Sequence, residues 1–301
     1  MSTFTWRGND FRWSLPANWL GNQVPVDGSD VIIDANNLVA SWPVLAPAAA
    51  LSLKSLTINL RDYDGNVALM NNGSPCGPIS VSESFVLTNS LGARQDINLG
   101  TYDGTVIHLL DGCTGTILLD SSLNTAALFV TVHGGALLNV TEQAPCLAGA
   151  GTTSLADASA HHGTITCHSL GGICFPQVLG DGCILNFYGT AGTWSGFQVD
   201  GDATVNFFDE ATVLGLVVNA DFTINAKHGV ALTYSAMNEG FTLNAEGPVL
   251  IAGATGTAGK AINVNILSPQ ADCLQMEIAD VAVNVFGRYA RGMSGTMARC
   301  P

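Results

Sequence analysis

The chain has 301 residues and a mass of 31.2 kDa, which is long enough to bury a sizeable hydrophobic core. Hydrophobic residues make up 47% of it and charged residues only 11%, a composition that excludes intrinsic disorder. Acidic residues outnumber basic ones by 24 to 10, and the net charge of −14 would repel nucleic acid, so no nucleic-acid partner is expected.

The N-terminal segment, residues 1–45, is rich in tryptophan and turn residues. Three of the five tryptophans, Trp6, Trp13 and Trp19, lie within residues 4–33. The exposed end of a stack of strands needs a cover, and this segment is predicted to be a cap with an entry strand. No basic region followed by an apolar run opens the chain, so no secretory signal is expected. No apolar stretch is long enough for a membrane span, so no membrane insertion is expected.

Four short motifs follow one another in this segment: Trp6-Arg-Gly8, Trp13-Ser-Leu-Pro-Ala-Asn-Trp19, Gly21-Asn-Gln-Val-Pro25 and Asp30-Val-Ile-Ile33. In this order they resemble the start of β-helical repeat proteins, which are mostly bacterial surface and adhesin-like proteins with some phage structural proteins. The match covers residues 4–33. The resemblance implies a β-helix and a surface or virion role, and it carries over no catalytic residue.

A short repeat runs through the rest of the chain. The pattern apolar, any, apolar, Asn, apolar recurs at Asn186, Asn206, Asn225, Asn244, Asn265 and Asn284, and the steps between these positions are 20, 19, 19, 21 and 19. The same phase extends backwards through apolar segments at Thr57–Asn59, Ile79–Val81, Ile97–Leu99, Ile117–Leu119 and Leu137–Asn139, with a loop insertion near 145–162. The segment from 46 to 286 is therefore predicted to contain roughly twelve repeats, each of about 20 residues.

This period decides the architecture. The repeats contain short alternating strands and Gly/Asn/Asp turns, and a propeller blade would need ~40 residues. We predict an all-β fold, a single right-handed parallel β-helix in which each repeat forms one coil and stacks on its neighbours. The six asparagines are predicted to form a ladder of side-chain hydrogen bonds, as in cross-β stacks. Alternation places them on the threonine side, facing outward, but a bend beside them would turn them inward.

The C-terminal segment, residues 287–301, lacks the repeat and carries Arg288, Arg291 and Arg299. Two interpretations stay open for it. It is a cap on the last coil, or it is an arm that reaches an acidic neighbour such as another copy of the chain.

Catalytic chemistry is not expected. Glycoside hydrolysis needs a pair of carboxylates, and the candidates are Asp200 with Asp202, Asp209 with Glu210, and Asp62 with Asp64. No Asp-Asp pair or Arg-x-Lys element accompanies them, as polygalacturonase-like enzymes would require. The eight cysteines form no CxxC pair, so we predict no metal site and no cofactor.

The low charge suits a surface that is buried in an assembly. We expect a non-enzymatic structural protein that forms a homo-oligomer, a trimer or larger, or a lattice. The outward Thr223 and Thr242 and the three C-terminal arginines are candidate contacts. A phage virion is the expected location, as a capsid decoration or fibre beside other virion proteins.

One alternative is a glycan-binding, adhesin-like module on the bacterial cell surface among other surface proteins. Another is a polysaccharide lyase or hydrolase.

Overall fold

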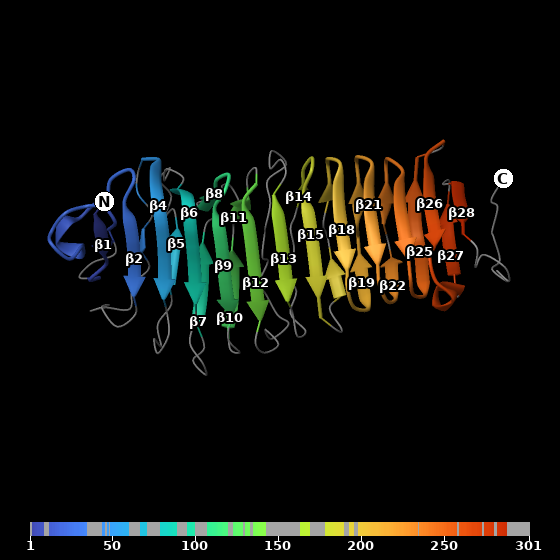
Figure 1. The fold of residues 1–301 in the computed structure, drawn as a ribbon, viewed down its shortest axis with the longest axis horizontal. Helices are drawn as coiled ribbons and strands as arrows, with labels where there is room; N and C mark the ends of the chain where they lie inside the picture. Colours follow the sequence, from blue (N-terminus) through green and yellow to red (C-terminus); the bar gives the residue numbers. More distant parts are fainter. Residues whose placement is uncertain are drawn as a thin grey trace. The chain divides into compact units, whose positions relative to one another are not determined.

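Strands make up nearly all the regular structure of the chain (Figure 1). A computed structural model describes residues 2–8, 12–34, 44–45, 47, 49–59, 67–70, 79–88, 95–99, 107–119, 123–128, 130–132, 135–142, 163–168, 178–189, 193–195, 198–233, 235–257, 259–272, 274–279 and 282–287. Within these ranges the only helical pieces are two 3₁₀ turns, Pro16–Asn18 and Pro269–Asp272, so the predicted all-β class is confirmed.

The chain forms two compact units, residues 1–156 and 157–301, and each is considered by itself. Their boundary falls in the insertion predicted near 145–162, which lies outside the described residues. Every strand pair named below is parallel, as expected for a solenoid-like fold.

Unit 1 contains a main sheet and a smaller one. The main sheet has the order β1-β2-β4-β6-β9-β12, with β8 beside β6 and β11 beside β8, and the smaller sheet has the order β3-β5-β7-β10. The strands are β1 (Thr3–Thr5), β2 (Asp30–Asp34), β3 (Val44–Leu45), β4 (Leu51–Asn59), β5 (Val67–Met70), β6 (Ile79–Thr88), β7 (Gln95–Leu99), β8 (Ile107–Leu109), β9 (Thr114–Leu119), β10 (Leu123–Leu128), β11 (Val130–Val132) and β12 (Leu137–Glu142).

The period predicted from the sequence is wrong for unit 1. Val31 pairs with Leu56, a step of 25, and Leu56 pairs with Phe85, a step of 29. Longer and shorter steps follow, since Leu87 pairs with Ile117 and Ile117 pairs with Val140. The predicted segment at Ile97 is part of β7 in the smaller sheet, whereas those at Ile79 and Ile117 lie in the main sheet. The evenly spaced apolar segments of unit 1 therefore do not occupy equivalent positions in successive coils.

Unit 2 follows the predicted period closely. Its main sheet has the order β13-β15-β18-β21-β24-β26-β28, and a second sheet covers the other sides of the coils. Figure 1 shows the main-sheet strands of this unit side by side in chain order. They are β13 (Thr164–His168), β15 (Ile184–Tyr188), β18 (Ala203–Phe207), β21 (Phe222–Ala226), β24 (Phe241–Ala245), β26 (Ala261–Ile266) and β28 (Ala282–Phe286). The second sheet contains β14 (Val178–Leu179), β16 (Thr193–Ser195), β17 (Gln198–Val199), β19 (Ala211–Leu214), β20 (Val217–Val218), β22 (Val230–Thr233), β23 (Ala236–Met237), β25 (Val249–Gly256) and β27 (Leu274–Ala279).

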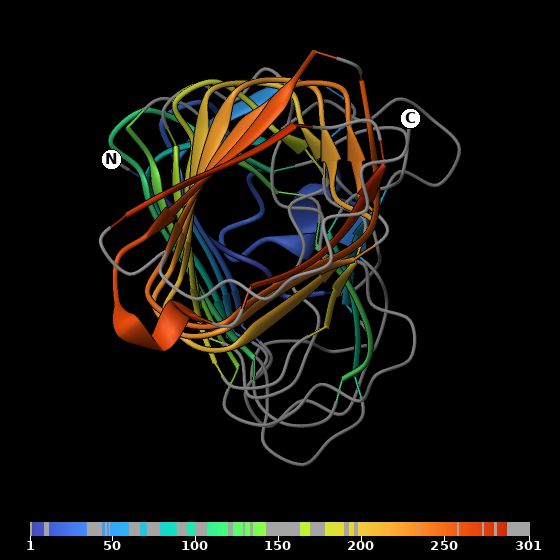
Figure 2. The same cartoon turned by 90° about the vertical axis from the view of Figure 1, so that its right-hand side faces the viewer.

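The main sheet of unit 2 is built on nearly constant steps between paired positions, which are 20, 20, 19, 19, 21 and 21 in chain order. These steps run through one buried column: Ile165, Leu185, Val205, Ile224, Leu243, Val264 and Val285. Leu185 to Val264 are fully buried, whereas Val285 in the last strand is partly exposed. In Figure 2 the strands of this unit lie one behind another.

Each coil of unit 2 buries alternate residues. From β18 to β20 the buried side chains are Ala203, Val205, Phe207, Ala211, Val213, Leu216 and Val218. The intervening strand residues face outward and are partly exposed. One coil cannot enclose this apolar interior alone, so its stability depends on the coils stacked on either side.

Candidate functional site

The outward side of the main sheet in unit 2 forms a regular surface, which we call the polar face. It consists of three columns that run across β15, β18, β21, β24 and β26. The threonine column is Ile184, Thr204, Thr223, Thr242 and Asn263; the asparagine column is Asn186, Asn206, Asn225, Asn244 and Asn265; the third column is Tyr188, Phe208, Lys227, Glu246 and Leu267.

The asparagine column is a continuous hydrogen-bonded ladder. The amide nitrogen of Asn206 donates to Asn186 over 2.8 Å, and that of Asn225 donates to Asn206 over 2.7 Å. Asn244 and Asn265 extend the ladder with donor–acceptor distances of 2.7 Å each. At its first rung Asn186 donates to Thr166 over 3.3 Å. The asparagines lie on the same side of the sheet as the threonines and are partly exposed. Their side chains therefore point outward, away from the apolar interior.

Asn284 does not extend this ladder, contrary to the sequence prediction. The last step of the sheet is 21 rather than 19, so Asn265 pairs with Phe286. Asn284 pairs with Asn263 and donates to its side-chain oxygen over 3.0 Å. The asparagine pattern therefore passes into the threonine column at β28.

The third column begins with stacked aromatic rings. His168 and Tyr188 have ring centroids 4.6 Å apart, and Tyr188 and Phe208 have centroids 4.2 Å apart with an interplanar angle of 2°. The stack is followed by an ion pair between Lys227 and Glu246. Because the ring faces contact one another, the stack presents ring edges outward.

A second polar ladder, which the sequence analysis missed, follows the turns before the main strands. Asn219 donates to Asp200 over 2.7 Å, and Asn238 donates to Asn219 over 2.7 Å. Gln198 also donates to both carboxylate oxygens of Asp200. The signal is a polar residue directly after Val199, Val218 and Met237, which recur at equal steps of 19.

One carboxylate in each of the pairs Asp200 with Asp202 and Asp209 with Glu210 makes structural contacts, whereas Asp62 and Asp64 lie outside the described residues. The Asp200 carboxylate is held by Gln198 and Asn219, and the Asp209 carboxylate accepts from the backbone of Gly189 over 2.7 Å. Among the described residues, no three His, Cys, Asp or Glu side chains are grouped so that they could hold a metal ion.

Two buried cysteines, Cys113 in unit 1 and Cys183 in unit 2, form no disulfide. Burial raises the pKa of Cys113 to about 11 and also raises the pKa of Cys183. Both are therefore protonated at neutral pH, and a thiol in this form is a poor nucleophile and metal ligand.

The three tryptophans lie together beside the first strands of unit 1. Trp19 is fully buried, and its ring packs edge-on against those of Trp6 and Trp13 at centroid distances of 4.9 and 4.8 Å. Its indole nitrogen donates to the Trp13 carbonyl over 2.8 Å, and the Trp6 backbone donates to Ile32 of β2 over 2.8 Å.

The C-terminal arginines predicted as contacts, Arg288, Arg291 and Arg299, lie outside the described residues.

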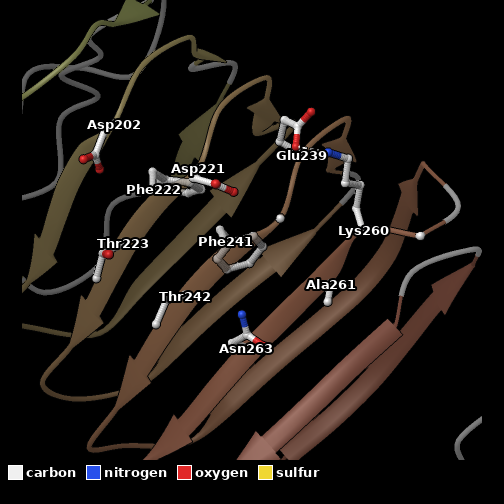
Figure 3. A pocket seen from close by; sticks show the side chains of 12 residues that line it. Asp202, Asp221, Phe222, Thr223, Glu239, Phe241, Thr242, Lys260, Ala261 and Asn263 are labelled. Carbon is white, nitrogen blue, oxygen red and sulfur yellow. Dashed lines mark hydrogen bonds and ion pairs between the residues drawn. The ribbon is translucent and has the colours of Figure 1, made fainter.

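A hollow of about 450 Å³ opens at one edge of the polar face, where β21, β24 and β26 begin (Figure 3). Thr223, Thr242 and Asn263 of the threonine column line it on one side. Asp202, Asp221 and the Glu239–Lys260 ion pair line it on the other. The hollow thus combines hydroxyl, amide and carboxylate groups.

Comparison of the chain with protein-family models, with curated proteins and with solved structures finds no match. In the described part of the chain, no helix is long and apolar enough to cross a membrane.

Proposed function

We propose that this chain is a non-enzymatic structural protein that assembles with copies of itself through the polar face. The observation that carries the proposal is that the threonine and asparagine columns contain no charged residue over five consecutive strands. Burying such a surface takes no ion out of water. Taking ions out of water is the main cost of burying polar protein surface. The only charges of the third column, Lys227 and Glu246, already pair with each other.

The ladder also favours association for an entropic reason. Each asparagine amide of the ladder is held by a neighbour at 2.7–2.8 Å before any partner binds. Association normally costs about 0.5–1.5 kcal/mol for each side chain that it immobilises, and here that cost is largely met in the free protein. The acidic residues Asp200, Asp202, Glu210 and Asp221 lie in exposed turns around the face, where a polar rim is usual.

The proposed assembly is a trimer or larger homo-oligomer, or a lattice, in a phage virion, as a capsid decoration or fibre. The proposal includes right-handed winding, which parallel strands joined by crossovers strongly prefer, and about twelve coils along the chain. Thr223 and Thr242, the contacts predicted from the sequence, lie where the face borders the hollow. The asparagine ladder forms the centre of the proposed contact, and the aromatic edges of Tyr188 and Phe208 lie beside it in the third column.

Light scattering after size exclusion tests the proposal. The purified protein should have the mass of a trimer or larger, and Phe208→Lys, which puts a charge in the contact, should shift it to the monomer. The matched control is Thr212→Lys, an outward residue of β19 on the second sheet, which should leave the assembly unchanged. A wild-type monomer of 31.2 kDa that also fails to bind phage particles would contradict the proposal.

A further inference from the structure

The hollow lies beside a departure from the regular period of unit 2. Met237 pairs with Gly256, and Phe241 pairs with Ile262. Three residues, 238–240, therefore separate Met237 from Phe241, whereas five residues, 257–261, separate their partners Gly256 and Ile262 one coil later. The longer connection contains a turn in which the Lys260 backbone donates to the Thr257 carbonyl over 3.2 Å. Lys260 then forms an ion pair with Glu239 of the preceding coil, and this pair makes one wall of the hollow (Figure 3).

Two carboxylates of the hollow are available to a ligand. Asp202 and Asp221 occupy equivalent positions in successive coils, because Ala203 pairs with Phe222. Both side chains are exposed, and neither carboxylate has a hydrogen-bond or ion partner in the described part of the chain. An ionised carboxylate is a strong acceptor that can hold two hydroxyl donors.

The opposite side supplies neutral groups. Thr223 and Thr242 stand next to each other in the threonine column, and each hydroxyl both donates and accepts. Asn263 follows them, and its side-chain oxygen accepts from Asn284, so its amide nitrogen remains as a donor. Figure 3 shows these three side chains in a row along the beginnings of β21, β24 and β26.

These groups select among ligand classes by charge and by hydrogen-bonding type. Asp202, Asp221, Glu239 and Lys260 carry two net negative charges, which disfavours phosphates, sulfates and uronic acids. A divalent cation such as Ca²⁺ requires about six to eight oxygen ligands, and the Lys260 ammonium beside the carboxylates would repel it. A neutral polyhydroxyl ligand satisfies carboxylate, hydroxyl, amide and ammonium groups together. The volume of about 450 Å³ lies within the ~300–1,000 Å³ of small-molecule sites.

We propose that the hollow is a binding site for a short segment of a neutral oligosaccharide. Asp202 and Asp221 accept hydrogen bonds from its hydroxyl groups, and Thr223, Thr242 and Asn263 bond to the other side of the same segment. This goes beyond the proposed assembly, because the asparagine ladder is the centre of the proposed contact, whereas the hollow lies at the edge of the polar face.

Isothermal titration calorimetry on the intact protein tests the site with named probes. The neutral probes are maltohexaose, cellohexaose, xylohexaose, mannohexaose and N-acetylated chitohexaose; hexagalacturonic acid, spermidine and CaCl₂ represent the competing ligand classes. We expect at least one neutral hexamer to bind with a millimolar or lower Kd, and hexagalacturonic acid to bind more weakly.

Two small substitutions locate the binding. Asp221→Asn and Thr242→Val should each weaken binding of the neutral hexamer at least tenfold with almost no change of shape. The first replaces one charged acceptor oxygen with an N–H donor, and the second removes the hydroxyl group. Glu210→Gln, which removes a carboxylate from an exposed turn outside the hollow, should leave affinity unchanged. Circular dichroism and light scattering on the same samples verify the fold and the assembly state.

The proposal is overturned if none of the neutral hexamers binds at millimolar concentration. Neutral binding that is insensitive to both substitutions would also overturn it, since the sugar would then bind elsewhere. Binding of only spermidine or CaCl₂ would make the hollow a cation site instead.

Discussion

The two units show what a constant coil length does to the surface of a parallel stack. In unit 2 the nearly equal steps bring identical side chains into register, and Asn186 to Asn265 form a ladder of one residue type. In unit 1 the steps are longer and unequal, and the corresponding outward bonds join different residues. There Asn59 donates to Asp34 over 3.4 Å, and Thr88 donates to Asn59 over 3.0 Å.

The interiors differ less than the surfaces. Leu56, Ile58, Phe85 and Leu87 of unit 1 are fully buried, as are the column residues of unit 2 from Leu185 to Val264. Apolar packing requires only that side chains of suitable volume meet, whereas an amide ladder requires one residue type at one position in every coil. Variation in coil length therefore disrupts polar columns before it disrupts the core.

The largest expected effect is on the tryptophan cluster of unit 1. Trp19→Ala should lower the free energy of unfolding of this unit by about 3–5 kcal/mol, because the ring is fully buried between Trp6 and Trp13. Urea titration with hydrogen exchange read separately in each unit would measure it. The neighbouring Leu20→Ala should have little effect, since Leu20 is 61% exposed. Equal losses in the two variants would show that the cluster does not stabilise unit 1.

A turn of unit 2 should be the next most sensitive position. A Cβ atom at Gly247 would clash with the His228 carbonyl of the preceding coil, so Gly247→Ala requires a backbone shift that should cost about 1–3 kcal/mol. Gly229 occupies a turn one coil earlier, and a Cβ there meets no atom closer than 3.6 Å. Thermal melts of Gly247→Ala and Gly229→Ala should therefore differ, and similar melting temperatures would mean that the coils are not held this closely.

The ladder should contribute a smaller amount. Asn225→Ala removes one bond donated to Asn206 and one accepted from Asn244, a loss of about 1–2 kcal/mol in urea unfolding of unit 2. Asn284→Ala removes a single bond at an exposed position and should cost less. If Asn284→Ala were the more damaging variant, the ladder would not explain the regularity of the face.

Alkaline pH should affect unit 1 through its buried thiol. Burial raises the pKa of Cys113 from its ordinary 9.0 to about 11, so the unfolded chain releases this proton at lower pH than the folded chain does. The stabilisation is fully present below pH 9 and is lost as the pH rises to about 11. Urea midpoints between these limits should fall more steeply for the wild type than for Cys113→Ala. Identical slopes would show that the thiol ionises without opening unit 1.

The exposed ion pair should matter least. Lys227→Ala breaks its pair with Glu246, and both side chains are substantially exposed, so we expect a loss of about 0.2–1 kcal/mol. High salt should remove most of the difference between variant and wild type in urea unfolding. A larger, salt-independent loss would instead indicate that the lysine stem packs on Phe208.

How well the sequence predicted the fold depended on coil length. The even spacing of Asn186, Asn206, Asn225, Asn244 and Asn265 gave both the register and the ladder of unit 2. The register of unit 1 could not be obtained in this way, because apolar segments such as those at Ile79 and Ile97 look alike but belong to different sheets. Periodicity alone does not distinguish one side of a coil from another.

The sites were predictable to different degrees. The longer step from Asn244 to Asn265 was visible in the sequence, but its two extra residues could have entered any turn of that coil. Their position in residues 257–261, which opens the hollow, follows only from the pairing of Met237 with Gly256 and of Phe241 with Ile262. Asn284 was misplaced for a related reason, since the sheet takes another long step just before it.

The matching register of β21 and β24 has a consequence for how such a chain changes length over evolution. Phe222-Thr-Ile-Asn-Ala and Phe241-Thr-Leu-Asn-Ala are nearly the same sequence at equivalent positions. Loss of residues 222–240 would join Asp221 directly to Phe241 and leave every neighbouring column in register. Duplication of the same segment would lengthen the ladder by one asparagine. Viable insertions and deletions in this region should therefore come in whole coils, so that the length of the protein varies in steps of about 19 residues.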